Sequence, residues 1–165
     1  MENKTTLQRR IRFLIGFFMC ALAASGLTAI PLEWELKLLM PFVEKNSQLG
    51  TIYPAVSEWI ERINDGVQNG YGKYPFLAYG TDWLAFGHVV IALAFIGPLR
   101  DPIKNIWVVE FGILACLLAM PWTLMFGVIR DIPFFWQLAD MSFGVFGIIP
   151  LWLARTDILR LQRTN

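Results

Sequence analysis

The chain is short and strongly hydrophobic: of its 165 residues, 56% are hydrophobic and only 16% are charged. A mean hydropathy of +0.50 is too high for a soluble domain of this length, so the composition predicts a single polytopic membrane domain over residues 1–165. The formal net charge of +1 provides no broad basic field, which excludes a nucleic-acid-binding protein.

The first predicted membrane span covers residues 13–30, directly after a basic stretch, and is long and apolar enough to cross a bilayer. The basic residues before it and the small residues at its end also resemble a secretory signal peptide, whose cleavage would leave three spans. We favour retention, because small residues recur here at helical spacing and suit close helix packing in lipid. These residues are Gly16, Cys20, Ala23 and Ala24.

Residues 31–81 form a long outer loop in which the sequence predicts two amphipathic helices. The apolar residues of the first share one helical face: Leu32, Leu36, Leu39 and Val43. Pro41 is expected to kink or end this helix. The second is expected to begin at Pro54 and to stop at Gly66 and Gly70. Both helices are interpreted as lying on the outer membrane surface or capping the bundle or, alternatively, as a lid over a site that opens there.

Three further spans are predicted over residues 82–99, 106–128 and 132–154. The predicted fold is therefore all-α: a four-transmembrane-helix bundle with amphipathic helices in the outer loop between the first two spans. Nine of the fourteen basic residues flank one membrane side: Lys4, Arg9, Arg10, Arg12, Arg100, Lys104, Arg155, Arg160 and Arg163. The positive-inside bias then predicts a multi-pass inner-membrane protein with both termini cytoplasmic.

Cofactor chemistry has little support in the sequence. Cys20 and Cys116 lie inside apolar segments and form no CxxC pair, so a thiol–disulfide relay is not indicated. A single histidine does not provide two axial haem ligands, and no HExxH spacing is present. We therefore expect no metal and no cofactor.

Two ionisable residues, His88 and Asp140, lie inside predicted spans and are the main candidates for function. A carboxylate in hydrocarbon costs roughly 3 kcal/mol, so Asp140 needs a partner or a purpose. At 1.5 Å per residue, His88 lies about 9 Å and Asp140 about 12 Å below the outer ends of their spans. The similar depth predicts that they meet, either in a structural hydrogen bond that fixes helix register or in a ligand or proton site. Because Asp140, Gly144 and Gly147 share one helix face, the carboxylate is expected to face protein, where a neighbouring backbone approaches closely.

Three other residues reach the same polar layer: Trp122, Thr123 and Gln137. We predict that they bind ligand together with His88 and Asp140, and that Asp82, Arg130 and Trp136 also contribute to ligand binding. Pro121 adds a carbonyl freed from helical hydrogen bonding.

Several of the charged residues near the span ends also have a structural interpretation. Asp82 and Asp131 can cap the starts of their spans. Arg130 can extend to the interface, pair with Asp82 or bind an anionic head group. Glu110, close to the cytoplasmic end of its span, is expected to pair with a basic residue there: Arg100, Lys104 or Arg155.

Three stretches of the chain resemble uncharacterised four-helix integral membrane proteins of bacteria. They are residues 74–88 (YPFLAYGTDWLAFGH), 97–102 (GPLRDP) and 132–136 (IPFFW). This resemblance covers the chain from about Glu58 onward and implies a four-helix membrane fold, with no assigned activity or site. A looser resemblance, in helix count and in buried His and carboxylate groups, is to the emopamil-binding and sigma-2 receptor superfamily, some of whose members isomerise sterols by proton transfer.

Two functional hypotheses follow. The leading one is a non-enzymatic membrane protein, in contact with membrane lipids, that binds a small amphipathic, lipid-like ligand or a partner subunit at its outer-facing polar layer. The alternative is a membrane enzyme in which His88 and Asp140 are the catalytic acid–base pair acting on a lipid-like substrate. The sequence leaves open whether the protein is an enzyme.

Overall fold

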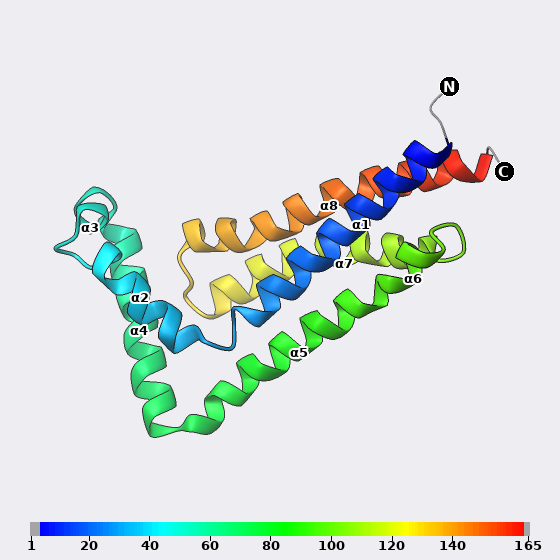
Figure 1. The fold of residues 1–165 in the computed structure, drawn as a ribbon. Helices are drawn as coiled ribbons and strands as arrows, with labels where there is room; N and C mark the ends of the chain where they lie inside the picture. Colours follow the sequence, from blue (N-terminus) through cyan, green and yellow to red (C-terminus); the bar gives the residue numbers. More distant parts are fainter. Residues whose placement is uncertain (1–3, 164–165) are drawn as a thin grey trace. The chain divides into compact units, whose positions relative to one another are not determined.

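The structure is a computed structural model that describes residues 4–163, and this range is helical with no strand (Figure 1). The elements are α1 (Lys4–Leu27), α2 (Leu32–Val43), α3 (Gln48–Ile52), α4 (Pro54–Lys73), the 3₁₀ turn η1 (Pro75–Leu77), α5 (Ala78–Ala94), α6 (Ile96–Arg100), α7 (Ile106–Ile129) and α8 (Phe134–Arg163). The all-α prediction is confirmed.

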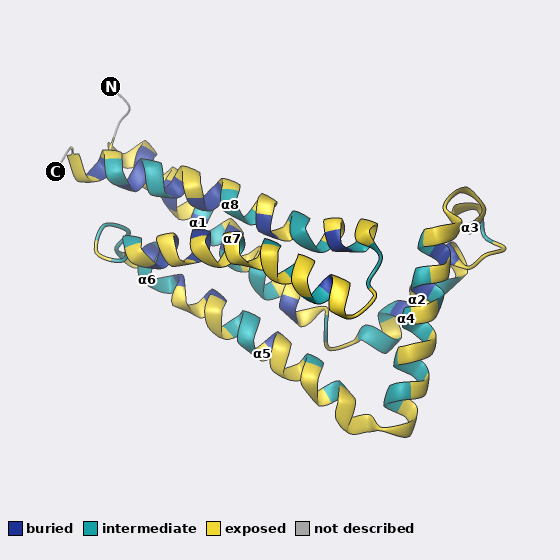
Figure 2. Cartoon of the chain, turned by 180° about the vertical axis from the view of Figure 1, so that it is seen from behind, coloured by how far each residue is buried: buried dark blue, intermediate teal, exposed yellow. Residues whose placement is uncertain are grey.

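Four helical segments are long and apolar enough to cross a membrane: Lys4–Leu27, Pro75–Arg100, Ile106–Ile129 and Phe134–Arg163. The number of candidate spans is therefore as predicted. The first and the last of these helices extend beyond the predicted limits, since α1 begins at Lys4 and α8 ends at Arg163. Large apolar side chains remain exposed along these helices (Figure 2), as expected of helices that face lipid.

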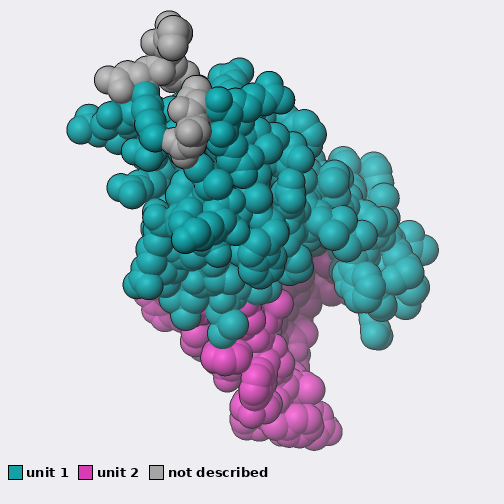
Figure 3. Space-filling view, turned by 90° about the vertical axis from the view of Figure 1, so that its right-hand side faces the viewer, with its two compact units in different colours: residues 1–22, 90–165 teal, residues 23–89 magenta. Residues whose placement is uncertain are grey.

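The chain divides into two compact units, shown in different colours in Figure 3. Unit 1 comprises Met1–Leu22 and Val90–Asn165, and unit 2 comprises Ala23–Val89. Unit 1 therefore contains most of α1 together with α6, α7 and α8, whereas unit 2 contains α2, α3, α4 and most of α5.

The core of unit 1 is an apolar cluster between α1, α7 and α8. The contributing residues recur at helical spacing on each helix: Leu7, Ile11, Ile15 and Phe18 on α1, Val108, Val109 and Ile113 on α7, and Leu151, Ala154, Ile158 and Leu161 on α8. Phe95 completes the cluster, and its ring lies 4.9 Å from that of Phe18. Since both contribute to this cluster, the start of α1 and the end of α8 lie at the same end of unit 1 (Figure 1).

Unit 2 shows that the long loop between the first two spans is helical. Leu36 and Val43 of α2 and Ile60 of α4 are buried, and the Ser47 side chain caps α3 by accepting the Gly50 N–H at 2.9 Å. α2 continues past Pro41 and ends two residues later, at Val43, because a proline removes only one helical hydrogen bond. The predicted end of the second loop helix is wrong. α4 continues through both predicted glycine stops to Lys73, because the residue before Pro75 is the one driven out of helical conformation.

Prolines also set the limits of the second span. α5 follows η1, begins at Ala78 and ends at Ala94. In a continuous helix, the N–H of residue 98 would donate to the carbonyl oxygen of Ala94. Pro98 has no N–H, so this hydrogen bond is absent. α6 ends at Arg100, and Asp101 adopts a non-helical conformation (φ −137°, ψ 89°) ahead of Pro102.

The turn between α7 and α8 depends on Asp131, whose φ of 53° is in the left-handed region. The Ile132 N–H donates to Gly127 O at 2.9 Å and the Asp131 N–H to Val128 O at 3.3 Å, which is the hydrogen-bond pattern of a Schellman motif. The prediction that Asp131 caps the start of the last span is therefore wrong. Asp131 closes the end of the preceding helix, α7.

Candidate functional site

His88 lies on α5 in unit 2, and one of its ring nitrogens is engaged. Its Nδ1 is 2.8 Å from the carbonyl oxygen of Leu84, and since a carbonyl oxygen only accepts, Nδ1 carries the proton and donates it. The side chain packs against Gly26, where an added Cβ would lie 2.3 Å from the His88 Cβ. Gly26 is thus required for the close approach of α1 to α5.

Asp140 lies on α8 in unit 1, where it is half-buried. Its carboxylate forms no hydrogen bond or ion pair within the described part of that unit. The expectation of a close backbone approach on this helix face is confirmed. An added Cβ at Gly144 would lie 2.8 Å from the Cys116 carbonyl oxygen, and one at Gly147 2.9 Å from the Cys116 Sγ. Because His88 and Asp140 belong to different units, the pair stays a prediction.

Gln137 is the buried polar residue of the predicted layer in unit 1. Its Nε2 donates to the carbonyl oxygen of Ile132 at 2.7 Å, and the side chain lies against Gly127, where an added Cβ would be 2.3 Å from its Cδ. Among described residues, its Oε1 has no hydrogen-bond partner. The Nε2 bond ties Gln137 to the turn between α7 and α8, so this residue has a structural role there.

The other predicted site residues of unit 1 are less buried. Trp122 is exposed, with its ring 4.8 Å from that of Phe126. Thr123 and Trp136 are half-buried, and Arg130 is exposed at the C-cap of α7.

Asp82 is not a helix cap, because α5 begins four residues earlier, at Ala78. Its carboxylate is exposed and forms no hydrogen bond or ion pair with any described residue. It shares one face of α5 with Tyr79, Trp83 and Phe86, and these four residues line a shallow hollow of about 240 Å³. The predicted structural role of Asp82 is therefore wrong, and its charge is available to a ligand.

The aromatic rings around Asp82 are arranged edge to face. The Tyr79 and Trp83 rings lie 5.9 Å apart and the Trp83 and Phe86 rings 5.4 Å apart, each pair at 84°. Tyr79 and His88 are nine residues apart, about two and a half helical turns, so they lie on opposite sides of α5. The aromatic hollow and the His88 contact with Gly26 are therefore separate features of this helix.

Sequence reasoning missed Asp157, a buried carboxylate near the end of α8. Its Oδ2 lies 3.2 Å from Arg10 Nε and its Oδ1 3.7 Å from Arg160. The apolar spacing of Leu151, Ala154, Ile158 and Leu161 continues past the predicted end of the span and could have revealed it. The predicted pairing of Glu110 is confirmed, with Arg155 donating to it at 2.8 Å.

The structure thus defines a helical protein with four candidate membrane-spanning helices. Across residues 4–163, no group of three or more His, Cys, Asp or Glu side chains is placed to hold a metal ion. No family model, curated protein or solved structure matches the chain. The resemblances drawn from the sequence therefore stay predictions.

Proposed function

We propose that this is a multi-pass inner-membrane protein, with both termini in the cytoplasm, that binds a small amphipathic, lipid-like molecule at its outer face. The observation that supports the proposal most directly is the hollow on α5, where the unpaired Asp82 carboxylate lies among three aromatic rings. This hollow belongs entirely to unit 2, whereas the proton-transfer alternative needs His88 and Asp140 of different units to act on one substrate.

The chemistry of the hollow favours a cationic head group. Aromatic ring faces attract ammonium groups by about 0.5–2 kcal/mol, and a carboxylate beside them adds a full opposite charge. Under the predicted topology, Asp82 lies near the outer end of its span, at the level of lipid head groups. An ammonium bound there would offset the cost of an unpaired carboxylate at the edge of the hydrocarbon.

The rest of the ligand would be apolar. Trp83 and Phe86 are exposed and follow Asp82 toward the middle of the helix, so a hydrocarbon chain can lie along them. The proposed ligand is therefore a single amphiphile with an ammonium head and an alkyl tail. A partner subunit covering the same face would bury the rings in a different way.

The proposal is tested by titrating the full chain in maltoside micelles with lysophosphatidylcholine, using lysophosphatidylglycerol of the same chain length as the probe without ammonium. We expect Asp82→Asn to weaken binding of the choline lipid about tenfold, equivalent to about 1.4 kcal/mol, and to leave the glycerol lipid unaffected. The matched control is Asp65→Asn, which removes an exposed and unpaired carboxylate on α4, away from the hollow.

Equal effects of the two Asn substitutions would contradict a site at Asp82, because they would show only a change in overall charge. Failure of the wild-type chain to distinguish the two lipids would also contradict it. A second polypeptide that co-purifies and protects Trp83 from quenching, with no lipid bound, would replace the lipid ligand by a partner subunit.

A further inference from the structure

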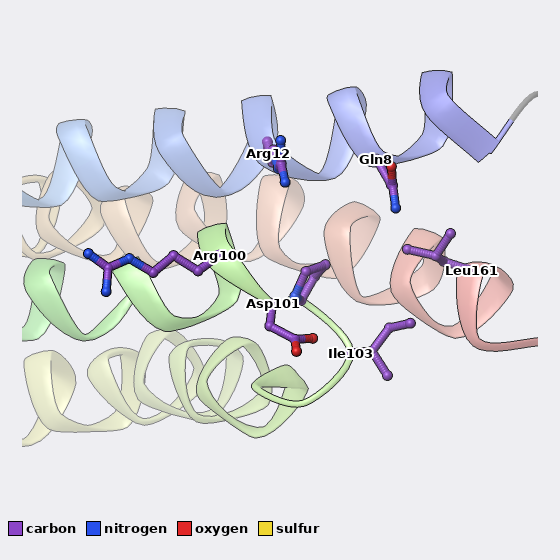
Figure 4. Close-up of a pocket in the computed structure, with 7 residues that line it drawn as sticks. Gln8, Arg12, Arg100, Asp101, Ile103 and Leu161 are labelled. Carbon is purple, nitrogen blue, oxygen red and sulfur yellow. The ribbon is translucent and has the colours of Figure 1, made fainter. Parts of the chain in front are cut away.

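The end of unit 1 that carries the two termini contains a second cavity, which the proposed function does not use. Its volume is about 160 Å³. It is lined by Gln8 and Arg12 of α1, Arg100 of α6, Asp101 and Ile103 of the following loop, and Leu161 of α8 (Figure 4). Three helices and a loop of one compact unit therefore converge on it.

The cations of this cavity have no partners, although other cations nearby do. Neither Arg12 nor Arg100 forms an ion pair with any described residue. Asp101, the one acid in the lining, is already engaged: its Oδ2 lies 3.5 Å from the Lys104 ammonium and its Oδ1 accepts the Lys104 backbone N–H at 3.1 Å. The cavity therefore carries an excess of positive charge.

The other described acids at this end of unit 1 do not neutralise that charge, because each is paired elsewhere. Asp157 is held by Arg10 and Arg160, and Glu110 by Arg155. Within residues 4–163, Arg12 and Arg100 therefore have no anionic partner, and both side chains are exposed to one from outside the chain.

The geometry points to a phosphate group bound between Arg12 and Arg100 as the occupant. Guanidinium groups match the oxygens of a phosphate and keep their charge at all physiological pH values. A cavity of about 160 Å³ has room for roughly five waters at about 30 Å³ each, which is enough for a tetrahedral phosphate. In Figure 4 the Arg100 guanidinium extends away from Asp101 and Ile103, so a phosphate held by both arginines requires the Arg100 side chain to rotate inward.

The apolar part of the lining indicates that the phosphate belongs to a lipid. Ile103 and Leu161 form an apolar wall beside the arginines. Under the predicted topology, the cavity is at the cytoplasmic ends of the spans, where basic pockets between helices bind anionic head groups. A soluble phosphate ester offers the same charged group without the hydrocarbon, so the experiment compares both sources.

The experiment measures retention of phosphatidylglycerol by the purified full chain, with phosphatidylcholine as the neutral lipid and inorganic phosphate and glycerol 1-phosphate as the soluble competitors. We expect Arg12→Gln and Arg100→Gln each to lower phosphatidylglycerol occupancy about tenfold. Arg9→Gln is the matched control, since Arg9 is an exposed, unpaired arginine of α1 that does not line the cavity. Its effect is expected to stay within twofold.

A variant that is expected to increase lipid occupancy distinguishes an effect on binding from an effect of misfolding. Asp101→Asn removes the negative charge but keeps an oxygen that can accept the Lys104 N–H, so it is expected to increase phosphatidylglycerol occupancy. Equal losses in Arg9→Gln and Arg12→Gln would overturn the proposal in favour of diffuse charge attraction. Loss of occupancy in Asp101→Asn would also overturn it. Displacement of the lipid by millimolar inorganic phosphate would support the site and assign it to soluble phosphates.

Discussion

The turn between α7 and α8 depends on one residue in a costly conformation. Asp131 has a φ of 53°, where a side chain clashes with the following carbonyl, and glycine is the usual residue at this position of a Schellman motif. Asp131→Gly relieves this clash but gives the unfolded chain more freedom. We expect a net gain of about 0.5–1 kcal/mol in the free energy of unfolding, measured by denaturant titration in micelles.

Asp131→Ala is the comparison for this prediction. Alanine keeps a Cβ and cannot hydrogen-bond its own backbone as aspartate can, so the free energy of unfolding is expected to fall by about 1 kcal/mol. Asp131→Gly should therefore raise the free energy of unfolding, and Asp131→Ala should lower it. If both destabilise the protein, the side chain of Asp131 matters more than its backbone conformation.

At the scale of single residues, the sequence showed which acidic residues lie near the ends of apolar runs, but it did not show their structural roles. Asp82 and Asp131 were both interpreted as caps at helix starts, because each precedes an apolar run. In the structure, α5 starts four residues before Asp82, and Asp131 ends a helix instead of starting one. Helix boundaries depend on the whole set of local hydrogen bonds, which composition and spacing do not fix.

The packing of α7 against α8 is set by a small residue at the point of contact. An added Cβ at Gly144 would lie 2.8 Å from the carbonyl oxygen of Cys116, which is backbone and cannot move away without shifting the helix. We expect Gly144→Ala to lower the free energy of unfolding by about 1–3 kcal/mol, measured by unfolding in micelles.

Gly87→Ala on α5 is the control, because a Cβ there has open space around it. Alanine is the better helix former by about 0.8–1 kcal/mol, so this variant should be neutral or slightly more stable. Equal destabilisation by both substitutions would attribute the effect to the loss of glycine itself and not to the contact with Cys116.

The all-α class and the four helices of membrane-spanning length were accessible from the sequence, because long apolar runs give a strong signal, whereas the short helices α3 and α6 were not predicted. The helix ends at Lys73 and Arg100 also have a visible cause, the following prolines Pro75 and Pro102. Glycines proved weaker stops than expected. A glycine costs only about 0.5–1 kcal/mol inside a helix, which the neighbouring residues of α4 overcome.

At the scale of the whole molecule, equal depth along the spans predicts one polar layer that contains His88 and Asp140. This layer stays a prediction, because the chain forms two compact units with His88 in one and Asp140 in the other. This division depends on which helix faces pack together. Contacts such as the one between Phe95 and Gly112 determine it, and the spacing of residues within a span does not reveal such contacts. The exposed hollow at Asp82 became visible only when the start of α5 was known.

The start of α1 and the end of α8 are joined by the ion pair between Arg10 and Asp157, whose carboxylate is almost fully buried. In the proposed topology, this contact puts the start of α1 and the end of α8 on one side of the membrane, which the positive-inside bias predicts to be the cytoplasm. We expect a cysteine at Lys4 or Lys104 to be protected from a membrane-impermeant maleimide in intact cells, and one at Asn46 to react. Cys20 and Cys116 are first replaced by alanine, and lysed cells serve as the accessibility control.

The same contact predicts that the first span stays in the mature protein. Cleavage after residue 29 would remove Arg10 and uncover Ile158 and Leu161, leaving a buried carboxylate without its strongest partner. Intact-mass measurement of the purified protein should therefore give the full chain, and Arg10→Gln should lower its unfolding temperature. A mass lacking the first span, or labelling of the cysteine at Lys4 from outside, would contradict this topology, because the buried Asp157 carboxylate would then keep only its longer contact with Arg160.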